Sequence, residues 1–107
     1  MLLLNKKLID NYVKRDKLLA IKFSEWAEII QNSDWQTSND IKATFKDADT
    51  ISKNVYIFNI KSSRSLCMVY FDENEVEIAW VGNHNDYDRK FNSKKKILKF
   101  LKDRGYE

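Results

Sequence analysis

The chain has 107 residues, enough for one hydrophobic core but not for two, so we expect a single domain over residues 1–107. A hydrophobic fraction of 43% argues against a disordered chain although 33% of the residues are charged. The net charge is only +3, yet eight of the 19 Lys and Arg residues fall between Arg89 and Arg104, where Asp103 is the one acid. This local excess predicts a polyanionic partner near that end, and a solvated, lysine-rich helix face is the alternative.

The composition also limits the cofactors and the cellular location. Cys67 is the single cysteine and lies in an apolar run, so we expect a buried side chain in a reducing cytoplasm. One cysteine and one histidine make a zinc site implausible, and the chain has neither a Gly-rich phosphate loop nor paired carboxylates. No cofactor is therefore expected. The apolar residues 1–4 are interrupted at Asn5, which leaves a segment too short for a signal sequence or a membrane span.

In chain order, the apolar pattern predicts a short strand at residues 2–4, then two helices and a short helical turn. The apolar positions of the helices recur at helical spacing, at Leu8, Ile9, Tyr12 and Val13 in the first and at Leu19, Phe23, Trp26 and Ile30 in the second. We expect the second stripe to face the core. Capping residues between Asp34 and Asp40 lead into the turn at residues 40–45.

The second half changes to the two-residue period of strands. Strands are predicted over Val55–Ile60, Leu66–Phe71 and Val76–Val81, with a turn at Ser62–Ser63 and a loop at residues 72–75. The last strand separates its side chains into two faces, with Val76, Ile78 and Trp80 on one and Glu77, Ala79 and Val81 on the other.

A Gly82–Asn83 turn is expected after the last strand, followed by a basic helical extension over residues 88–107. The apolar stripe of this extension should face the core, with its lysines turned outward; the stripe comprises Ile97, Leu98, Phe100 and Leu101. Trp35 and Trp80 are expected in the core. The predicted class is α+β, with helices packed on an antiparallel meander.

Five ordered segments of the second half carry a resemblance to a known family. They are Asp40-Ile41-Lys42 with Phe45, Ala48-Asp49, Val55–Ile60, Met68–Phe71, and Val81-Gly82-Asn83-His84-Asn85-Asp86-Tyr87-Asp88. Together they resemble the HigB family of toxins from bacterial toxin–antitoxin pairs, within the RelE/ParE superfamily of mRNA interferases. The turn after Ile60 is about two residues shorter than is usual in the family, and Arg64 takes the place of a family arginine when that gap is accepted.

The resemblance implies a RelE/ParE-like fold, an activity and a partner. Two N-terminal helices would pack on one side of a twisted antiparallel sheet, with the nucleic-acid surface on its other side. The activity would be endonucleolytic cleavage of mRNA, often on the ribosome, and it would arrest growth. The partner would be a HigA-like helix-turn-helix antitoxin whose complex with the toxin represses its own operon.

The candidate catalytic residues are His84, Tyr87, Arg64 and Lys61. Cleavage of RNA without a metal needs a base for the 2′-hydroxyl, an acid for the 5′-oxygen and positive charge on the phosphoryl oxygens. His84 is the only histidine and can serve as base or acid. Tyr87 can orient the phosphate, stack on a base or share a proton, while Lys61 and Arg64 flank the first hairpin and can neutralise the phosphate.

Further cations are candidates for RNA binding, namely Lys42, Arg89, Lys90, Lys94 and Lys95. Each candidate also has a plainer interpretation: His84 as a turn residue, Tyr87 as a ring that caps the sheet, and Lys61 and Arg64 as ordinary hairpin charges. Asp88 is expected to orient Arg89 or to cap a turn. Two competing functions remain open, a ParE-like toxin that acts on a protein such as DNA gyrase and a non-catalytic RNA- or protein-binding module.

Overall fold

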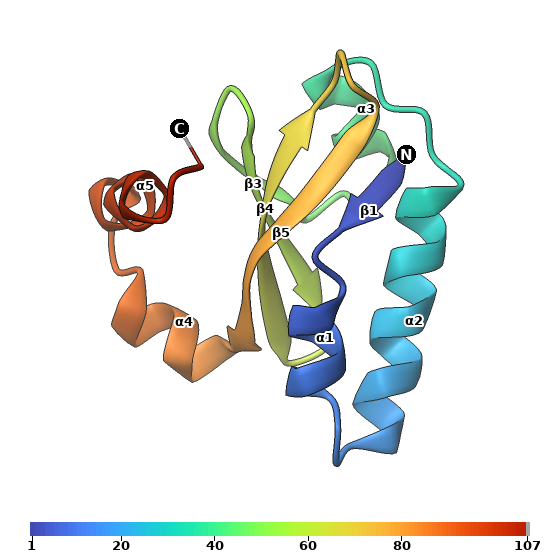
Figure 1. Cartoon of the computed structure of the whole chain (residues 1–107), viewed down its shortest axis with the longest axis vertical. Helices are drawn as coiled ribbons and strands as arrows, with labels where there is room; N and C mark the ends of the chain where they lie inside the picture. Colours follow the sequence, from blue (N-terminus) through green and yellow to red (C-terminus); the bar gives the residue numbers. More distant parts are fainter. Residues whose placement is uncertain (107) are drawn as a thin grey trace.

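The computed structural model describes residues 1–106 and has an α+β fold, as the sequence predicts (Figure 1). Within these residues, five helices accompany a mixed sheet of five strands. The elements in chain order are β1 (Leu2–Leu4), α1 (Lys7–Tyr12), α2 (Lys17–Gln31), α3 (Ser38–Thr44), β2 (Asp49–Ser52), β3 (Val55–Ile60), β4 (Ser63–Tyr70), β5 (Glu75–Asn83), α4 (His84–Lys90) and α5 (Lys94–Asp103).

The sheet has the strand order β1-β5-β4-β3-β2. Strands β3 to β5 form the expected antiparallel meander, and β2 extends it beside β3. Strand β1 pairs with β5 in parallel, so the sheet is mixed rather than antiparallel. The side chain of Asn5 supports this pairing, because its Nδ2 donates to the carbonyl of Ile78 at 2.8 Å. No helix within residues 1–106 combines the length and the apolar character needed to cross a bilayer.

Short polar side chains start three of the helices. The carboxylate of Asp16 accepts the backbone N–H of Leu19 at the start of α2. Asn83 does the same for Asp86 at the start of α4, with an N···O distance of 2.8 Å, and Ser93 accepts from the third residue of α5. These caps satisfy N–H groups that a helix leaves unpaired at its N-terminus.

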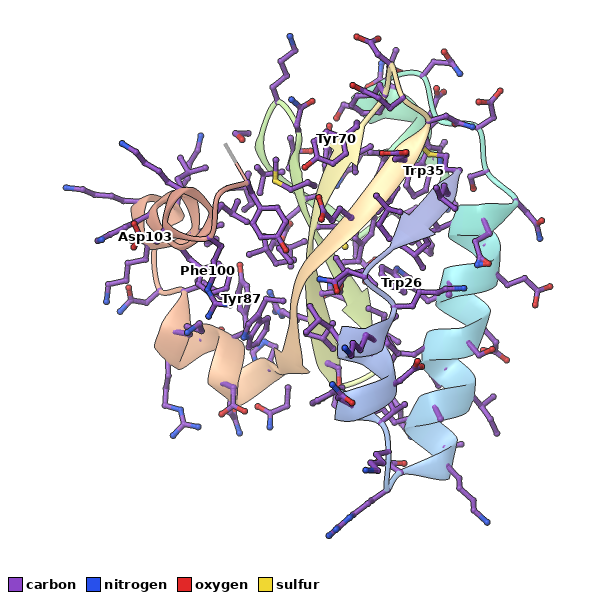
Figure 2. The ribbon with its side chains drawn as sticks, viewed as in Figure 1. Trp26, Trp35, Tyr70, Tyr87, Phe100 and Asp103 are labelled. Carbon is purple, nitrogen blue, oxygen red and sulfur yellow. The ribbon has the colours of Figure 1, made fainter. Side chains whose placement is uncertain are left out.

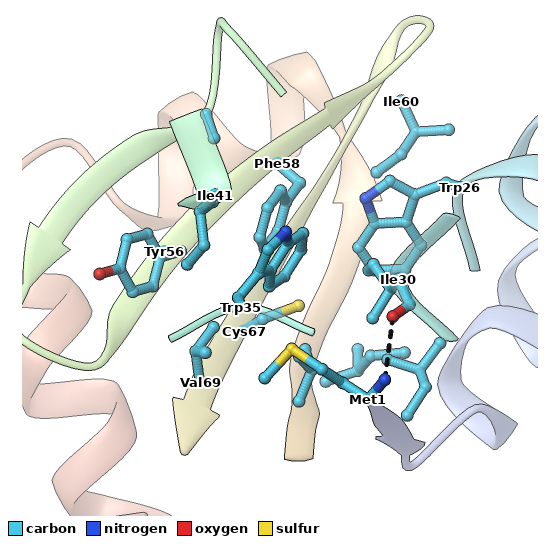
Figure 3. Packing of buried hydrophobic residues seen from close by; sticks show 14 of the residues in the cluster. Met1, Trp26, Ile30, Trp35, Ile41, Tyr56, Phe58, Ile60, Cys67 and Val69 are labelled. Atoms are coloured by element: carbon cyan, nitrogen blue, oxygen red, sulfur yellow. Dashed lines mark hydrogen bonds between the residues drawn. The ribbon is translucent and has the colours of Figure 1, made fainter. Parts of the chain in front are cut away.

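One face of the sheet packs against α1, α2 and α3 around a cluster of aromatic rings (Figure 3). The ring of Trp26 meets that of Phe58 edge-on at 5.7 Å, and Trp35 stacks on Phe58 at 6.0 Å. The predicted core stripe of the second helix and the burial of Trp35 and Cys67 are thereby confirmed. The amino group of Met1 donates to the carbonyl of Ile30 and to two others at the C-terminal end of α2, where a cation is stabilising.

The opposite face of the sheet is covered by α4 and α5 (Figure 1). A second apolar cluster joins strand residues to helix residues there; it contains Val55, Ile57, Leu66, Met68 and Ala79 together with Tyr87, Phe91, Ile97 and Leu101. The nucleic-acid surface that the resemblance implies for this side of the sheet stays a prediction, and α4 and α5 cover part of that side. The reason for this cover is the apolar stripe of the C-terminal helix, which finds its partner on the sheet.

A β-bulge in the middle of β5 changes which side chains share a face. Leu66 pairs with Trp80 and the next residue, Cys67, pairs with Ile78, so Ala79 is the extra residue. Ile78 consequently packs in the first cluster and Trp80 against the second, and the predicted strict alternation along this strand is wrong.

Several boundaries also differ from the predictions. The first hairpin turn lies at Lys61 and Ser62, one residue earlier than expected, with Lys61 in the left-handed region at φ 57°. Gly82 and Asn83 are the last residues of β5 rather than a turn. The basic extension is two helices, α4 and α5, and β2 is a strand that the sequence pattern did not predict.

Candidate functional site

Three of the candidate catalytic residues meet at the end of the sheet where the β3–β4 turn lies beside the start of α4. The backbone N–H of His84 donates to the carbonyl of Ser62 at 3.0 Å, which fixes His84 next to the turn that contains Lys61. Arg64 follows on β4, directly opposite Gly82 of β5. The pairing of β4 with β5 thus joins the hairpin cations to the first residues of α4.

His84 is the first residue of α4, and its side chain is half-exposed. Its Nδ1 lies 3.2 Å from Oδ2 of Asp88, one helical turn further along. The expectation that Asp88 orients Arg89 is wrong, because Arg89 pairs with Asp86 instead. A carboxylate at Nδ1 orients the imidazole and leaves Nε2 as the nitrogen that can exchange a proton with a ligand.

Tyr87 and Arg64 are in direct contact. The guanidinium carbon of Arg64 lies 4.8 Å from the centre of the Tyr87 ring, a cation–π geometry. Burial raises the pKa of Tyr87 above its usual value, and the carboxylates of Asp49 and Asp88 add to this, while the charge of Arg64 opposes it. The phenol therefore keeps its proton at neutral pH. Nε of Arg64 is buried without a hydrogen-bond partner among residues 1–106.

The ring of Tyr87 also belongs to the second apolar cluster. It is only 8% exposed and lies between α4 and the sheet, 5.6 Å from the ring of Phe91 (Figure 2). Trp80 contacts both rings, at 6.1 Å from Tyr87 and 5.2 Å from Phe91. Tyr87 is thus both a neighbour of Arg64 and a packing residue, so the site has a rigid aromatic support.

The remaining candidates lie elsewhere. The ammonium group of Lys42 donates to the carbonyl of Ala48 at 2.6 Å and ties down the loop after α3. Lys90 extends over the rings of Phe91 and Phe100, with Nζ 5.8 and 5.1 Å from their centres. Lys94 and Lys95 are exposed in the first turn of α5. RNA binding by these lysines and by Arg89 stays a prediction.

Sequence reasoning missed Asp88 as the partner of His84. The signal was present, since the two residues are four apart and follow Asn83, a residue type that starts helices. No three metal-ligating side chains gather within residues 1–106.

A comparison with protein families supplies the identity of the chain. The model of the HigB toxins, described as the RelE-like toxic component of a toxin–antitoxin system, matches residues 20–90. The chain belongs to the HigB toxin family. The match contains Lys61, Arg64, His84 and Tyr87, and it ends before α5. A comparison with curated proteins found no match.

The protein is therefore a RelE-like toxin of a toxin–antitoxin system, and membership of this family implies an antitoxin partner. Because α5 begins at Lys94, the helix that covers much of the second sheet face lies outside the part that matches the HigB family.

Proposed function

We propose that this HigB-family toxin is an endoribonuclease that cleaves mRNA through the 2′-hydroxyl of its substrate, without a metal. The observation that supports this most is that Arg64 contacts Tyr87 at the end of the sheet where the backbone of His84 is bonded to the turn that carries Lys61. These residues supply a proton acceptor, a hydroxyl donor and positive charge, which are the groups that the reaction needs.

In the proposed reaction, Nε2 of His84 takes the proton of the 2′-hydroxyl, and the 2′-oxygen attacks the adjacent phosphorus. The bond from phosphorus to the 5′-oxygen breaks, the 5′-oxygen takes a proton from solvent, and a 2′,3′-cyclic phosphate remains. Arg64 stabilises the charge that develops on the phosphoryl oxygens, and Lys61 adds to the attraction. Tyr87, whose raised pKa keeps its hydroxyl protonated, donates a hydrogen bond to the phosphate.

The natural substrate is proposed to be mRNA under translation on the ribosome, in the cytoplasm. The antitoxin is proposed to be a HigA-like helix-turn-helix protein. The positive side chains proposed to attract the RNA backbone are Lys42, Arg89, Lys90, Lys94 and Lys95. An affinity that depends on such charges falls as the salt concentration rises.

One observation favours a second candidate function. The sheet face on which the family resemblance implied the nucleic-acid surface is covered by α4 and α5, and the Tyr87 ring is almost fully buried. A toxin that inhibits a protein such as DNA gyrase would need neither an open sheet face nor the chemistry of His84.

Expression without an antitoxin separates the two functions. We would induce wild type, His84→Ala and Asn85→Ala, map transcript 5′ ends and follow growth. Asn85 is the exposed neighbour of His84 on α4 and serves as the matched control. The nuclease proposal expects new 5′ ends inside reading frames in wild type and Asn85→Ala only, with circular dichroism unchanged in His84→Ala. Growth arrest in all three strains with intact messages would overturn the proposal and favour a protein target.

A further inference from the structure

A second feature with the chemistry of a nucleic-acid site lies away from His84, in a hollow between α4 and α5. The hollow has a volume of about 330 Å³. Its lining residues are Lys90 and Phe91 from the end of α4 and Lys96, Lys99, Phe100 and Asp103 from α5. Figure 2 shows Phe100 and Asp103 on the part of α5 that lies near α4.

The hollow is built by the helical period of α5. Ile97 and Leu101 are buried on the sheet and fix the rotation of the helix. The lining residues of α5 recur at intervals of three, one and three, so they share one side of the helix. This side faces the end of α4, from which Lys90 and Phe91 also line the hollow.

The floor of the hollow is aromatic and carries cations. Phe100 is partly exposed and meets the ring of Phe91 edge-on at 5.1 Å. The ammonium of Lys90, which lines the hollow, lies 5.1 Å from the centre of the Phe100 ring. Outside the lining, the guanidinium carbon of Arg104 lies 4.7 Å from the same centre. An aromatic ring is a surface on which nucleobases stack.

The rim of the hollow is positive. Asp103 is its one carboxylate, and that carboxylate is already paired with Lys99 at 3.0 Å. Neither Lys96 nor Lys90 has an ion-pair partner among residues 1–106, and Nζ of Lys90 lies over the rings of Phe91 and Phe100. Two ammonium groups beside an apolar floor match a ligand that combines phosphate with a planar base.

We propose that this hollow binds one nucleotide of single-stranded RNA, with its base against Phe100 and its phosphates against Lys90 and Lys96. The inference rests on the proposed function, because it names a second place where the same RNA is held. The seven residues of α4 span roughly 10 Å, so a strand of a few nucleotides held at His84 reaches the hollow.

The inference is tested by binding rather than by cleavage. A fluorescent, fully 2′-O-methylated oligouridine cannot be cleaved through its 2′-oxygen, and its anisotropy reports affinity for the full-length toxin. Lys96→Ala is expected to weaken binding several-fold and to reduce the slope of log affinity against log salt by about one. Lys14→Ala is the matched control, because Lys14 is an exposed lysine in the connection between α1 and α2, on the other side of the sheet.

Stacking is tested by Phe100→Leu, which keeps an apolar side chain in the hollow. We expect about a tenfold loss of affinity for the oligouridine and little change for an abasic ribose-phosphate oligomer of the same length. Thermal unfolding of each variant controls for folding.

Equal affinities of Lys96→Ala and Lys14→Ala for the oligouridine would overturn the inference. It would also be overturned if Phe100→Leu lost as much affinity for the abasic oligomer as for the oligouridine. If wild type still cleaves mRNA in that case, the proposed function survives without this nucleotide site. If wild type neither binds nor cleaves RNA, both proposals are overturned.

Discussion

Nδ1 of His84 faces Oδ2 of Asp88 at 3.2 Å across one turn of α4. When the imidazole is neutral it can donate its Nδ1–H to this carboxylate, and when it is protonated the two form an ion pair. In either state Asp88 limits the rotation of the ring that we propose as the proton acceptor, although both side chains are more than half exposed.

Asp88→Ala is therefore expected to slow RNA cleavage by about two- to fivefold, because an exposed pair contributes up to about 1 kcal/mol. Single-turnover rates on a defined RNA measure the effect. Asp86→Ala is the control, since it removes a carboxylate from the same helix that pairs with Arg89 and not with His84. A loss as large as that of His84→Ala would mean that Asp88 takes part in the chemistry itself.

Tyr87→Phe is expected to make stability less sensitive to alkaline pH. Burial raises the pKa of Tyr87, so the folded protein keeps a proton that the unfolded chain loses near pH 10. The contribution of this phenol to the free energy of unfolding is complete below its pKa in the unfolded chain. It is lost as pH rises through its pKa in the folded protein. Urea unfolding at about pH 8 and about pH 10.5 compares the two proteins.

The pKa of Tyr106 is also raised, with burial as the largest cause, so Tyr106→Phe should independently reduce the loss of stability at alkaline pH.

An identical fall in the free energy of unfolding for wild type and Tyr87→Phe would show that the phenol of Tyr87 is not protected by the fold.

Gly82→Ala is expected to destabilise the protein by about 1–3 kcal/mol through overpacking. A Cβ at position 82 would lie 2.5 Å from Cζ2 of the Trp80 indole, which is held between Tyr87 and Phe91. Chemical denaturation measures the loss, and tryptophan emission reports the displaced ring.

A second substitution tests this explanation. Trp80→Phe removes the part of the indole that occupies the space above Gly82, so the double variant should lose less stability than the sum of the two single variants. Additive losses would mean that Gly82 is needed for another reason, such as the backbone conformation of β5.

Cys67 is expected to resist thiol reagents in the folded protein. Its side chain is 0% exposed, and burial raises the pKa of the thiol to about 12, so the reactive thiolate is absent at neutral pH. Labelling with an aromatic disulfide at about pH 8 should be negligible until guanidinium unfolds the chain. Rapid labelling of the native protein would show that the cluster between the sheet and helices α1 to α3, which contains Cys67, opens readily.

Apolar periodicity predicted the parts of the fold that bury large side chains. The helical stripe that contains Phe23 and Trp26 and the continuous run around Leu66 were recognised because burial alone dictates these patterns. Strand β2 was missed because Ile51 is its only large apolar residue and it exists through pairing with β3. The bulge at Ala79 was missed because a register shift depends on two strands and not on one.

The candidate site was predictable as a set of residue types but not as an arrangement. His84 and Tyr87 stood out by their chemistry, and Arg64 by its place after the first hairpin. The contact of Arg64 with Tyr87 depends on α4, a short polar helix whose sequence has no apolar period. The position of α5 on the sheet depends on tertiary packing. Its amphipathic stripe predicts that the helix packs against a core, but not which face of the sheet it covers.

The parallel pairing of β1 with β5 sets an order on the assembly of this toxin. β1 is synthesised well before β5, yet Asn5 bonds to Ile78, 73 residues later. Contacts between such distant segments form late, because the chain between them must first be ordered. Although β1 precedes β5 along the chain, it is thus among the last elements to dock, and a growing chain has no complete sheet until β5 has left the ribosome that makes it.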